Sequence, residues 1–190
     1  MIIKISFVCY YITATIPNHV NLIKMREILE NHNLGFEEIL NSSVLNQTSN
    51  FYFYFRPTTG ICDCGTELGK LNKLEKHFSP ITISKLEKKG WSKTKIDRWL
   101  SEKVSYKSKQ NLKTEILKES NLSETEFWHQ LILKFFSMNL CNEFGLLIHW
   151  YEGSLEEEFK LKSILKINLN YLSNSFFEEM ENDILYLFQK

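Results

Sequence analysis

The residues best suited to chemistry are two cysteines separated by one residue. Cys62 and Cys64 flank Asp63 in a loop that holds three glycines within ten residues. Because glycine lets the backbone turn freely there, both sulfurs can face one ion or each other. Thiolate sulfur is a preferred ligand of Zn²⁺ in structural sites, so Cys62 and Cys64 are candidate metal ligands.

A structural zinc ion takes four ligands, and this pair supplies only two. The sequence has no CxxC or HxxxH pair that would supply the others at standard spacing. Any further ligand must be brought in by the fold, and the candidates are Cys9, His77, Cys141 and His149. The sequence does not establish a cofactor, and zinc is the candidate for the cysteine pair.

The same loop also suits a catalytic or redox-active thiol. Arg56 and the backbone amides of the loop would stabilise a thiolate at Cys62 or Cys64. His149, at the end of an expected strand, would serve as the base. Asp63 opposes this interpretation, because a neighbouring negative charge disfavours a thiolate. A third interpretation needs no chemistry: both cysteines are small loop residues that allow a tight turn.

Two phosphate-binding motifs come close and are excluded. Gly60 and Gly65 have the spacing of the glycines in a P-loop, but Thr66 stands where that motif requires lysine. Lys70 follows Cys64 by six positions, whereas the loop of cysteine phosphatases needs arginine to grip phosphate with two hydrogen bonds. Neither activity is predicted.

The net charge of zero hides an uneven distribution of charged residues. Between residues 70 and 118, fourteen Lys or Arg stand against five Asp or Glu, whereas the rest of the chain has nine against eighteen. Such a basic segment is typical of proteins that contact a nucleic acid or another polyanion. It can also dock on the acidic flanks of its own chain or form a solvated face. The residues expected to make an intermolecular contact are Lys93, Lys95, Arg98, Lys103, Lys107 and Lys109.

The centre of the basic segment has the outline of a helix-turn-helix. A short helix over residues 82–89 would end at Gly90, and Ser92 would cap the next helix. DNA recognition is one interpretation of this pair. Packing of Trp91 and Trp99 in a core is the simpler explanation of the pair, so the motif alone does not establish DNA binding.

Apolar periodicity predicts an α+β fold with a mixed or antiparallel sheet and a central helical insertion. Residues 41–50, which are rich in Asn and Ser, are expected to form a loop. The best-specified local structure is a helix start at Ser123, where Glu126 completes a capping box. Strands are expected at 2–12, 36–40, 51–56, 144–151, 164–172 and 183–188, and further helices at about 22–33, 111–118 and 173–181.

The length of 190 residues predicts one domain with three parts. Residues 1–60 would form a β-α-β half, residues 70–142 a helical, basic insertion, and residues 143–190 returning strands and a short helix. Hydrophobic residues make up 43% of the chain and aromatic residues 14%, a composition that excludes a disordered protein.

Four scattered cysteines are too few for a disulfide framework, which indicates a reducing, cytoplasmic compartment. Residues 5–16 are interrupted by polar side chains and fit a buried strand better than a secretion signal. The chain has no run of about 18 apolar residues, so no membrane-spanning helix is expected. The Ile-, Asn- and Lys-rich usage indicates an AT-rich genome, as in a bacterium or its phage.

These features predict a non-enzymatic binding protein of the inhibitor, immunity or regulatory type. Its basic helical segment would contact a nucleic acid, a nucleoprotein or an acidic protein partner, and such contacts weaken steeply with salt when phosphates are involved. The alternative is a cysteine-dependent or zinc-binding enzyme centred on Cys62, Asp63 and Cys64, with His149 as the catalytic base. Whether the protein is an enzyme is left open by the sequence.

Overall fold

The computed structural model describes residues 9–48, 52–69, 86–88, 90–96, 98 and 122–190. These residues form an α+β fold with six strands in one mixed sheet, which confirms the expected fold class. The strands are β1 (Cys9–Pro17), β2 (Glu37–Glu38), β3 (Tyr52–Arg56), β4 (Glu143–Tyr151), β5 (Ser163–Asn168) and β6 (Ile184–Gln189). The helices are α1 (Leu22–Asn31), α2 (Ser42–Thr48), α6 (Glu124–Ser137), α7 (Asn174–Glu178) and the 3₁₀ turn η2 (Leu169–Tyr171). Most of the expected helical insertion lies outside the described residues and stays a prediction.

The strand order is β2-β3-β1-β4-β6-β5, so β1 and β4 occupy the centre of the sheet. Neighbouring strands are antiparallel except β5 and β6, which run parallel. The crossover between those two strands is made by η2 and α7, because parallel neighbours cannot be joined by a tight hairpin. Every residue of β1 is buried, which confirms the expectation of a central strand covered on both faces.

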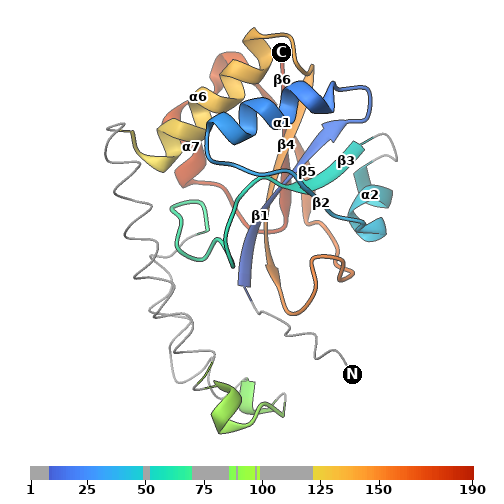
Figure 1. The fold of residues 1–190 in the computed structure, drawn as a ribbon, viewed down its shortest axis with the longest axis vertical. Helices are drawn as coiled ribbons and strands as arrows, with labels where there is room; N and C mark the ends of the chain where they lie inside the picture. Colours follow the sequence, from blue (N-terminus) through green and yellow to red (C-terminus); the bar gives the residue numbers. More distant parts are fainter. Residues whose placement is uncertain (1–8, 49–51, 70–85, 89, 97, 99–121) are drawn as a thin grey trace.

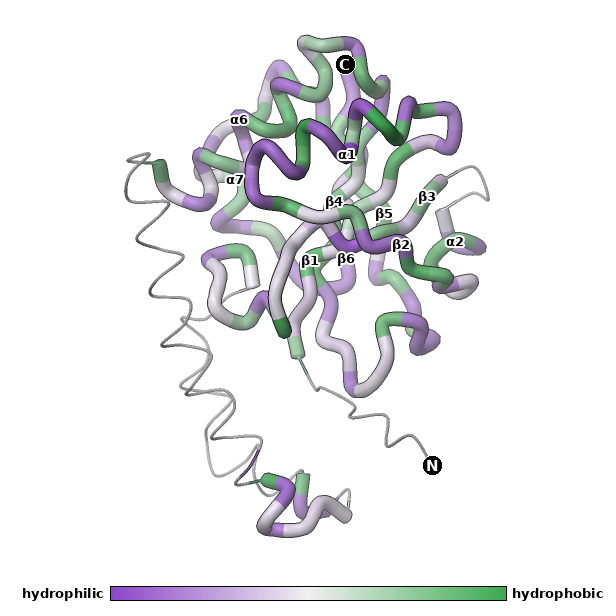
Figure 2. Tube along the Cα trace, in the orientation of Figure 1, coloured by the Kyte–Doolittle hydropathy of each residue, from purple (hydrophilic) through white to green (hydrophobic). Residues whose placement is uncertain are grey.

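An apolar layer covers each face of the sheet. α1, α6 and α7 pack on one face (Figure 1). Trp128 of α6 is among the largest side chains buried there. Val44 of α2 belongs to a smaller cluster on the other face. Successive residues of β4 show the division, because Leu146 joins the cluster beneath the helices and Leu147 joins the smaller one. In Figure 2 hydrophobic and hydrophilic residues alternate along α1 and α6, as expected for helices with one face on a core.

The first strand extends further than the sequence indicated. The expected strand ended at residue 12, whereas β1 continues to Pro17. Residues 13–15 pair with β4 and residues 14–17 pair with β3, so ladders on both sides hold this stretch extended. The expected start of the strand, residues 2–8, lies outside the described part of the chain.

The expectation of a loop at residues 41–50 is wrong, because this stretch contains helix α2. Asn41 caps the helix: its Oδ1 accepts a hydrogen bond from the Val44 N–H, and its carbonyl oxygen accepts one from the Leu45 N–H. Val44 is fully buried in the smaller apolar cluster. Tertiary packing therefore stabilises a helix that the Asn- and Ser-rich composition disfavours.

The two long helices begin where the sequence predicted. α1 follows Asn21, whose side chain accepts hydrogen bonds from the N–H groups of Ile23 and Lys24. α6 follows the expected capping box, in which Ser123 and Glu126 each bond the other residue's backbone N–H. The buried stripe expected on α6 is confirmed for Trp128, Leu131, Ile132, Phe135 and Phe136.

Several elements are shorter than expected. α6 ends at Ser137 instead of residue 140, and Asn139 beyond it adopts the left-handed backbone conformation with φ of 49°. β5 ends at Asn168, whose side chain caps η2, and β2 has only two residues. The strands β3, β4 and β6 match the expected ranges to within one residue. In the described ranges, no helix has the length and apolar character needed to cross a membrane.

Candidate functional site

The candidate thiols lie in residues 57–69, which follow β3 and are named the cysteine loop. Pro57 comes directly after the last residue of β3 and ends the strand, because proline has no N–H to continue a ladder. Gly60 adopts a φ of 109°, a conformation that side chains other than hydrogen rarely tolerate. The chain turns there and returns along β1.

The cysteine loop takes the place of a strand beside β1. Within β1, only residues 14–17 pair with β3. Along the preceding residues, the Asp63 N–H donates to the Tyr10 carbonyl oxygen at 2.9 Å, and Asp63 Oδ2 accepts from the Ile12 N–H at 2.9 Å. The Tyr10 N–H donates to Cys64 Sγ at 3.3 Å. These bonds satisfy buried backbone groups of β1, and in doing so they fix the loop against the central strand.

Asp63 is also held from its other side by Arg56. The two residues are 2% and 5% exposed, and Arg56 Nη2 lies 3.5 Å from Asp63 Oδ1. The Thr58 hydroxyl donates to Asp63 Oδ2 at 2.8 Å and accepts from Arg56 Nε at 3.0 Å. Arg56 Nη1 donates to the Gly60 carbonyl oxygen at 2.8 Å, and the guanidinium lies 4.6 Å from the centroid of the Tyr11 ring. The loop therefore contains a buried ion pair with hydrogen bonds to both members.

Burial raises the pKa of the Asp63 carboxyl above its ordinary value. The Arg56 guanidinium, the Ile12 N–H and the Thr58 hydroxyl all act in the opposite direction, because each favours the ionised carboxylate. Removal of Arg56 would leave this buried carboxyl without its cation. Asp63 thus anchors the cysteine loop. The stability of the loop depends on Arg56, because Arg56 supplies the cation for this buried carboxylate.

The end of the loop is a tight turn that requires glycine. The N–H and the hydroxyl of Thr66 both donate to the Asp63 carbonyl oxygen, at 3.1 and 2.9 Å. The Gly69 N–H donates to the Thr66 hydroxyl at 2.8 Å. A Cβ atom on Gly69 would stand 1.8 Å from the Asp63 carbonyl oxygen, which no side chain can tolerate without a shift of the backbone.

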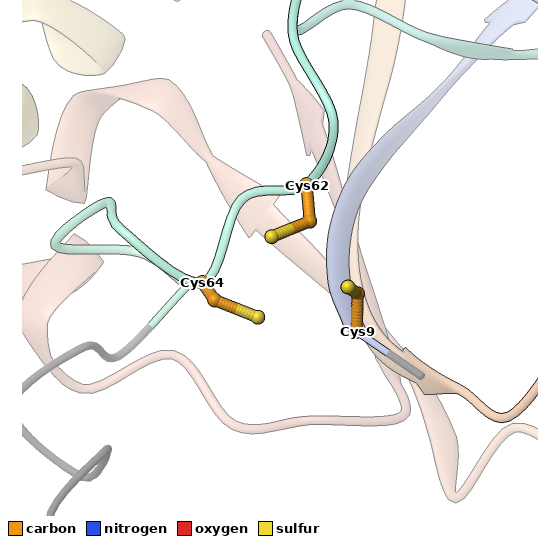
Figure 3. A group of neighbouring side chains, drawn as sticks. All are labelled: Cys9, Cys62 and Cys64. Carbon is orange, nitrogen blue, oxygen red and sulfur yellow. The ribbon is translucent and has the colours of Figure 1, made fainter. Parts of the chain in front are cut away.

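Three thiols converge where the cysteine loop meets β1. The Sγ atoms of Cys9, Cys62 and Cys64 all lie within 4.8 Å of one another. Figure 3 shows the side chains of the two loop cysteines and of Cys9 directed toward one shared space. The three residues are 1%, 1% and 3% exposed. Of the four residues that the fold could add to the loop pair, the structure brings in Cys9.

Converging thiols can bind a soft cation or exchange with a disulfide. Both reactions need the sulfurs to approach one another, and the hydrogen bonds of Asp63 hold the cysteine on each side of it against β1. Burial limits the second reaction, since a redox partner must reach a sulfur. The arrangement is better suited to an enclosed ion than to a large substrate.

Comparison with protein-family models, with curated proteins and with solved structures found no match for the chain.

His149 occupies a separate polar cluster on β4. Its Nδ1 lies 2.6 Å from Asp183 Oδ1, and its Nε2 lies 3.7 Å from Glu157 Oε1. The imidazole stacks on the Phe159 ring with centroids 3.6 Å apart, and Lys162 Nζ lies 3.2 Å from Asp183 Oδ2. Both ring nitrogens thus face carboxylates, and His149 does not belong to the group of converging donor atoms at the cysteines.

Of the two other candidate ligands, only Cys141 is described by the structure, and it is not part of the thiol group. Cys141 is buried just before β4, and burial raises the pKa of its thiol to about 12. The positive charge of Lys190, at the far end of the chain, acts on this pKa in the opposite direction. His77 lies outside the described residues.

A pair of glutamates joins the cysteine loop to the start of α6. The Glu67 N–H donates to Glu124 Oε2 at 2.5 Å, and the Thr125 N–H donates to Glu67 Oε2 at 3.3 Å. The Trp128 indole N–H donates to Glu124 Oε1 at 3.4 Å. Burial, together with the nearby charges of Glu67 and Asp63, raises the pKa of the Glu124 carboxyl to about 7. We name this contact the Glu67/Glu124 bracket.

The turn in the basic segment has the local structure that the sequence predicted. Gly90 adopts a φ of 79°, and the Trp91 N–H donates to the Leu86 carbonyl oxygen at 3.0 Å. A left-handed glycine with this hydrogen bond is a standard helix end. Ser92 then caps the next helical turn, since its hydroxyl accepts from the Lys95 N–H at 3.3 Å.

Half of the expected contact residues fall in this described turn. Lys93, Lys95 and Arg98 are all exposed, and Lys95 Nζ lies 4.1 Å from the centroid of the Trp91 ring. The other three, Lys103, Lys107 and Lys109, lie outside the described residues.

Sequence reasoning missed the residues that position the thiols. It treated Arg56 as a neighbour of the cysteines, whereas the guanidinium is directed at Asp63, seven residues away. The contact between Glu67 and Glu124 was not predicted, because the two residues are 57 positions apart in the sequence. For Arg56 and Asp63 a signal was present in the sequence, namely opposite charges at either end of a short glycine-containing loop.

Proposed function

We propose that this chain is a binding protein, of the inhibitor, immunity or regulatory type, whose basic segment contacts a polyanionic partner. The partner would be a nucleic acid, a nucleoprotein or an acidic protein surface. The observation that carries the proposal is the Glu67/Glu124 bracket, which holds the residues on either side of the basic segment together.

The bracket bears on function because the positive charge is concentrated between its two sides. All six strands of the described sheet come from outside residues 70–121. The described sheet thus contains no strand from the basic segment. A charged segment inserted between two tethered points of a folded body suits contact with a partner.

The described turn supports the same proposal. Lys93, Lys95 and Arg98 are exposed within six residues, and they lie in a capped turn that fixes the local backbone. Clustered cations on a short ordered element raise the local attraction for phosphate or carboxylate groups. Trp91 contributes an aromatic ring beside Lys95, which suits stacking with a base as well as packing within the protein.

The enzyme alternative has less support. Cys62 and Cys64 are almost completely buried, whereas a nucleophilic thiol must reach its substrate. His149, the expected base, faces Asp183 and Glu157. We therefore expect no thiol of the native protein to react with iodoacetamide faster than an ordinary cysteine at neutral pH, and one abnormally fast thiol would favour the enzyme.

Binding to polyanions over a range of salt concentrations tests the proposal. Duplex DNA, single-stranded RNA and poly-glutamate would each be titrated with the full chain and with a variant that combines Lys93→Glu, Lys95→Glu and Arg98→Glu. The matched control reverses three exposed lysines outside the basic segment: Lys24→Glu, Lys160→Glu and Lys166→Glu.

For a nucleic acid, we expect the logarithm of the affinity to fall linearly with the logarithm of salt concentration. For each phosphate that the variant no longer neutralises, the slope decreases by about 0.9 with duplex DNA and by about 0.7 with single-stranded RNA. Three substitutions in the turn should therefore reduce the slope by up to about 2.7 or about 2.1, while the control keeps the wild-type slope. Binding to poly-glutamate alone would identify an acidic protein as the partner class. No salt-dependent binding to any of the three, or equal weakening in both variants, would contradict the proposal.

A further inference from the structure

We propose that Cys9, Cys62 and Cys64 together bind one zinc ion, with each sulfur as a thiolate ligand. The ion would join the central strand β1 to the cysteine loop. This inference does not depend on the proposed function of the basic segment, because it uses only residues of the described body.

The distances between the sulfurs fit one ion. Metal–sulfur bonds of about 2.3 Å in a tetrahedron place the sulfurs about 3.8 Å apart. The Sγ atoms of Cys9, Cys62 and Cys64 already lie within 4.8 Å of one another. Small changes in side-chain torsions therefore suffice for all three to share one ion, and the backbone can keep its position.

The backbone around the site is fixed by contacts of Asp63 and by the pairing of β1, so a metal ion is not needed to hold the three cysteines in place. Asp63, between the two loop cysteines, is bonded to Tyr10 and Ile12 of β1 and to Arg56. Cys9 lies on β1 itself. Ligands on such rigid supports lose little conformational entropy when the ion binds.

The surroundings are also suited to thiolates. The Tyr10 N–H donates to Cys64 Sγ at 3.3 Å, the kind of outer hydrogen bond that stabilises a metal-bound thiolate. Each thiol releases its proton to solvent as its bond to the metal forms. Zn²⁺ then supplies two positive charges, which offset most of the charge of three thiolates. Arg56 does not serve this purpose, because its guanidinium is engaged by Asp63.

Burial decides between an ion and a larger partner for these thiols. The three residues are between 1% and 3% exposed, so a small cation reaches the sulfurs more readily than a protein or an organic substrate does. Thiolate ligands select soft or borderline cations such as Zn²⁺ over Mg²⁺ or Ca²⁺. The three thiolates provide three of the four positions of a tetrahedral ion.

Metal content and Co²⁺ titration test the inference on the full chain. Reduced protein would be equilibrated with Zn²⁺ in the presence of a weak chelator and analysed for bound metal. The variants are Cys9→Ser, Cys62→Ser and Cys64→Ser, and the matched control is Cys141→Ser, which changes a buried cysteine outside the group. Circular dichroism would check that each variant is folded.

We expect about one zinc per chain in wild type and in Cys141→Ser, and loss of most of it in each of the other variants. Because a Cys→Ser variant can fail to fold, the wild-type chain is also titrated with Co²⁺. Thiolate-to-cobalt charge-transfer absorption that saturates at one ion, with a melting temperature that rises with added Zn²⁺, would support the site. Absence of that absorption, or zinc retained in Cys9→Ser, would overturn it and leave three thiols packed as ordinary core residues.

Discussion

The cysteine loop lies beside β1 and the His149 cluster lies on β4, and these two regions use their polar groups in different ways. Around His149, both ring nitrogens face carboxylates and the imidazole stacks on Phe159. In the cysteine loop, the carboxylate of Asp63 is engaged by β1 and Arg56, while three sulfurs are directed at one another. Sulfur atoms that converge can bind an ion together, whereas the imidazole and carboxylates of the His149 cluster contact one another and hold the fold together.

Residue type alone did not predict which side chains share a site. His149 and the cysteines carry the side chains most often used in catalysis, and a shared site was an attractive hypothesis. In the register of β1 and β4, His149 pairs with Tyr11 and Cys9 pairs with Tyr151, so they are close along the sheet. Their side chains nevertheless belong to different networks.

Removal of Arg56 should have the largest effect on stability. Arg56→Met leaves Asp63 buried without its cation, and the free energy of unfolding should fall by about 3–5 kcal/mol. Urea unfolding would measure the change. Arg26→Met is the control, because the Arg26 guanidinium lies over the Phe36 ring at an exposed position and its loss should cost about 1 kcal/mol or less. Equal effects in the two variants would mean that the ion pair does not anchor the cysteine loop.

A methyl group at Gly69 should have the next largest effect. Gly69→Ala places a Cβ against the Asp63 carbonyl oxygen, and the forced shift should cost about 1–3 kcal/mol. In Gly153→Ala the nearest atom to the new Cβ is 3.5 Å away, so the cost should stay within about 0.5 kcal/mol. Thermal unfolding of the two variants side by side measures the difference. A Gly69→Ala protein as stable as the control would show that the turn is not tight.

Replacement of His149 tests whether the two regions are separate. His149→Phe keeps a ring for stacking on Phe159 but removes both contacts with carboxylates, and it should cost about 1–2 kcal/mol. Zinc affinity, measured by competition with a chelator, should not change. A loss of zinc affinity of tenfold or more in a folded variant would place His149 in the thiol site and refute the separation.

A pH dependence is expected from the Glu67/Glu124 bracket. The Glu124 carboxyl has its pKa raised to about 7, so the folded state retains a proton that the unfolded chain loses at lower pH. The resulting stabilisation is fully present below about pH 4.5 and is lost as pH rises toward 7. Glu124→Gln should remove this dependence, so the melting temperatures of variant and wild type should diverge between pH 4.5 and 7, with the variant gaining. A constant difference over that range would contradict the raised pKa.

Local signals explain which parts of the fold could be predicted. The capping box at Ser123 and the apolar stripe of α6 lie within one helix, and both are present. α2 was missed because its stability comes from burial of Val44 in a tertiary cluster, which Asn- and Ser-rich composition does not reveal. The expected strand from residue 164 to 172 was cut short because Asn168 caps a 3₁₀ turn.

The candidate site was predictable only in part, because it also depends on contacts between residues far apart in the sequence. The pair Cys62 and Cys64 stands out in the sequence, and Cys9 was one of four candidates to join them. The choice among the four depends on the loop lying beside β1, a contact between Tyr10 and Cys64 that spans 54 residues. The contact exists because β3 pairs with only part of β1 and the loop lies along the rest of that edge. A pattern of neighbouring residues does not encode such a long-range arrangement.

X-ray absorption at the zinc edge tests most directly whether the three thiols share one metal ion. The full chain would be loaded with one equivalent of Zn²⁺ and freed of excess metal by gel filtration. We predict a first shell that contains three sulfurs at about 2.3 Å. A shell of only oxygen and nitrogen, or a chain that loses its zinc on the column, would contradict the claim.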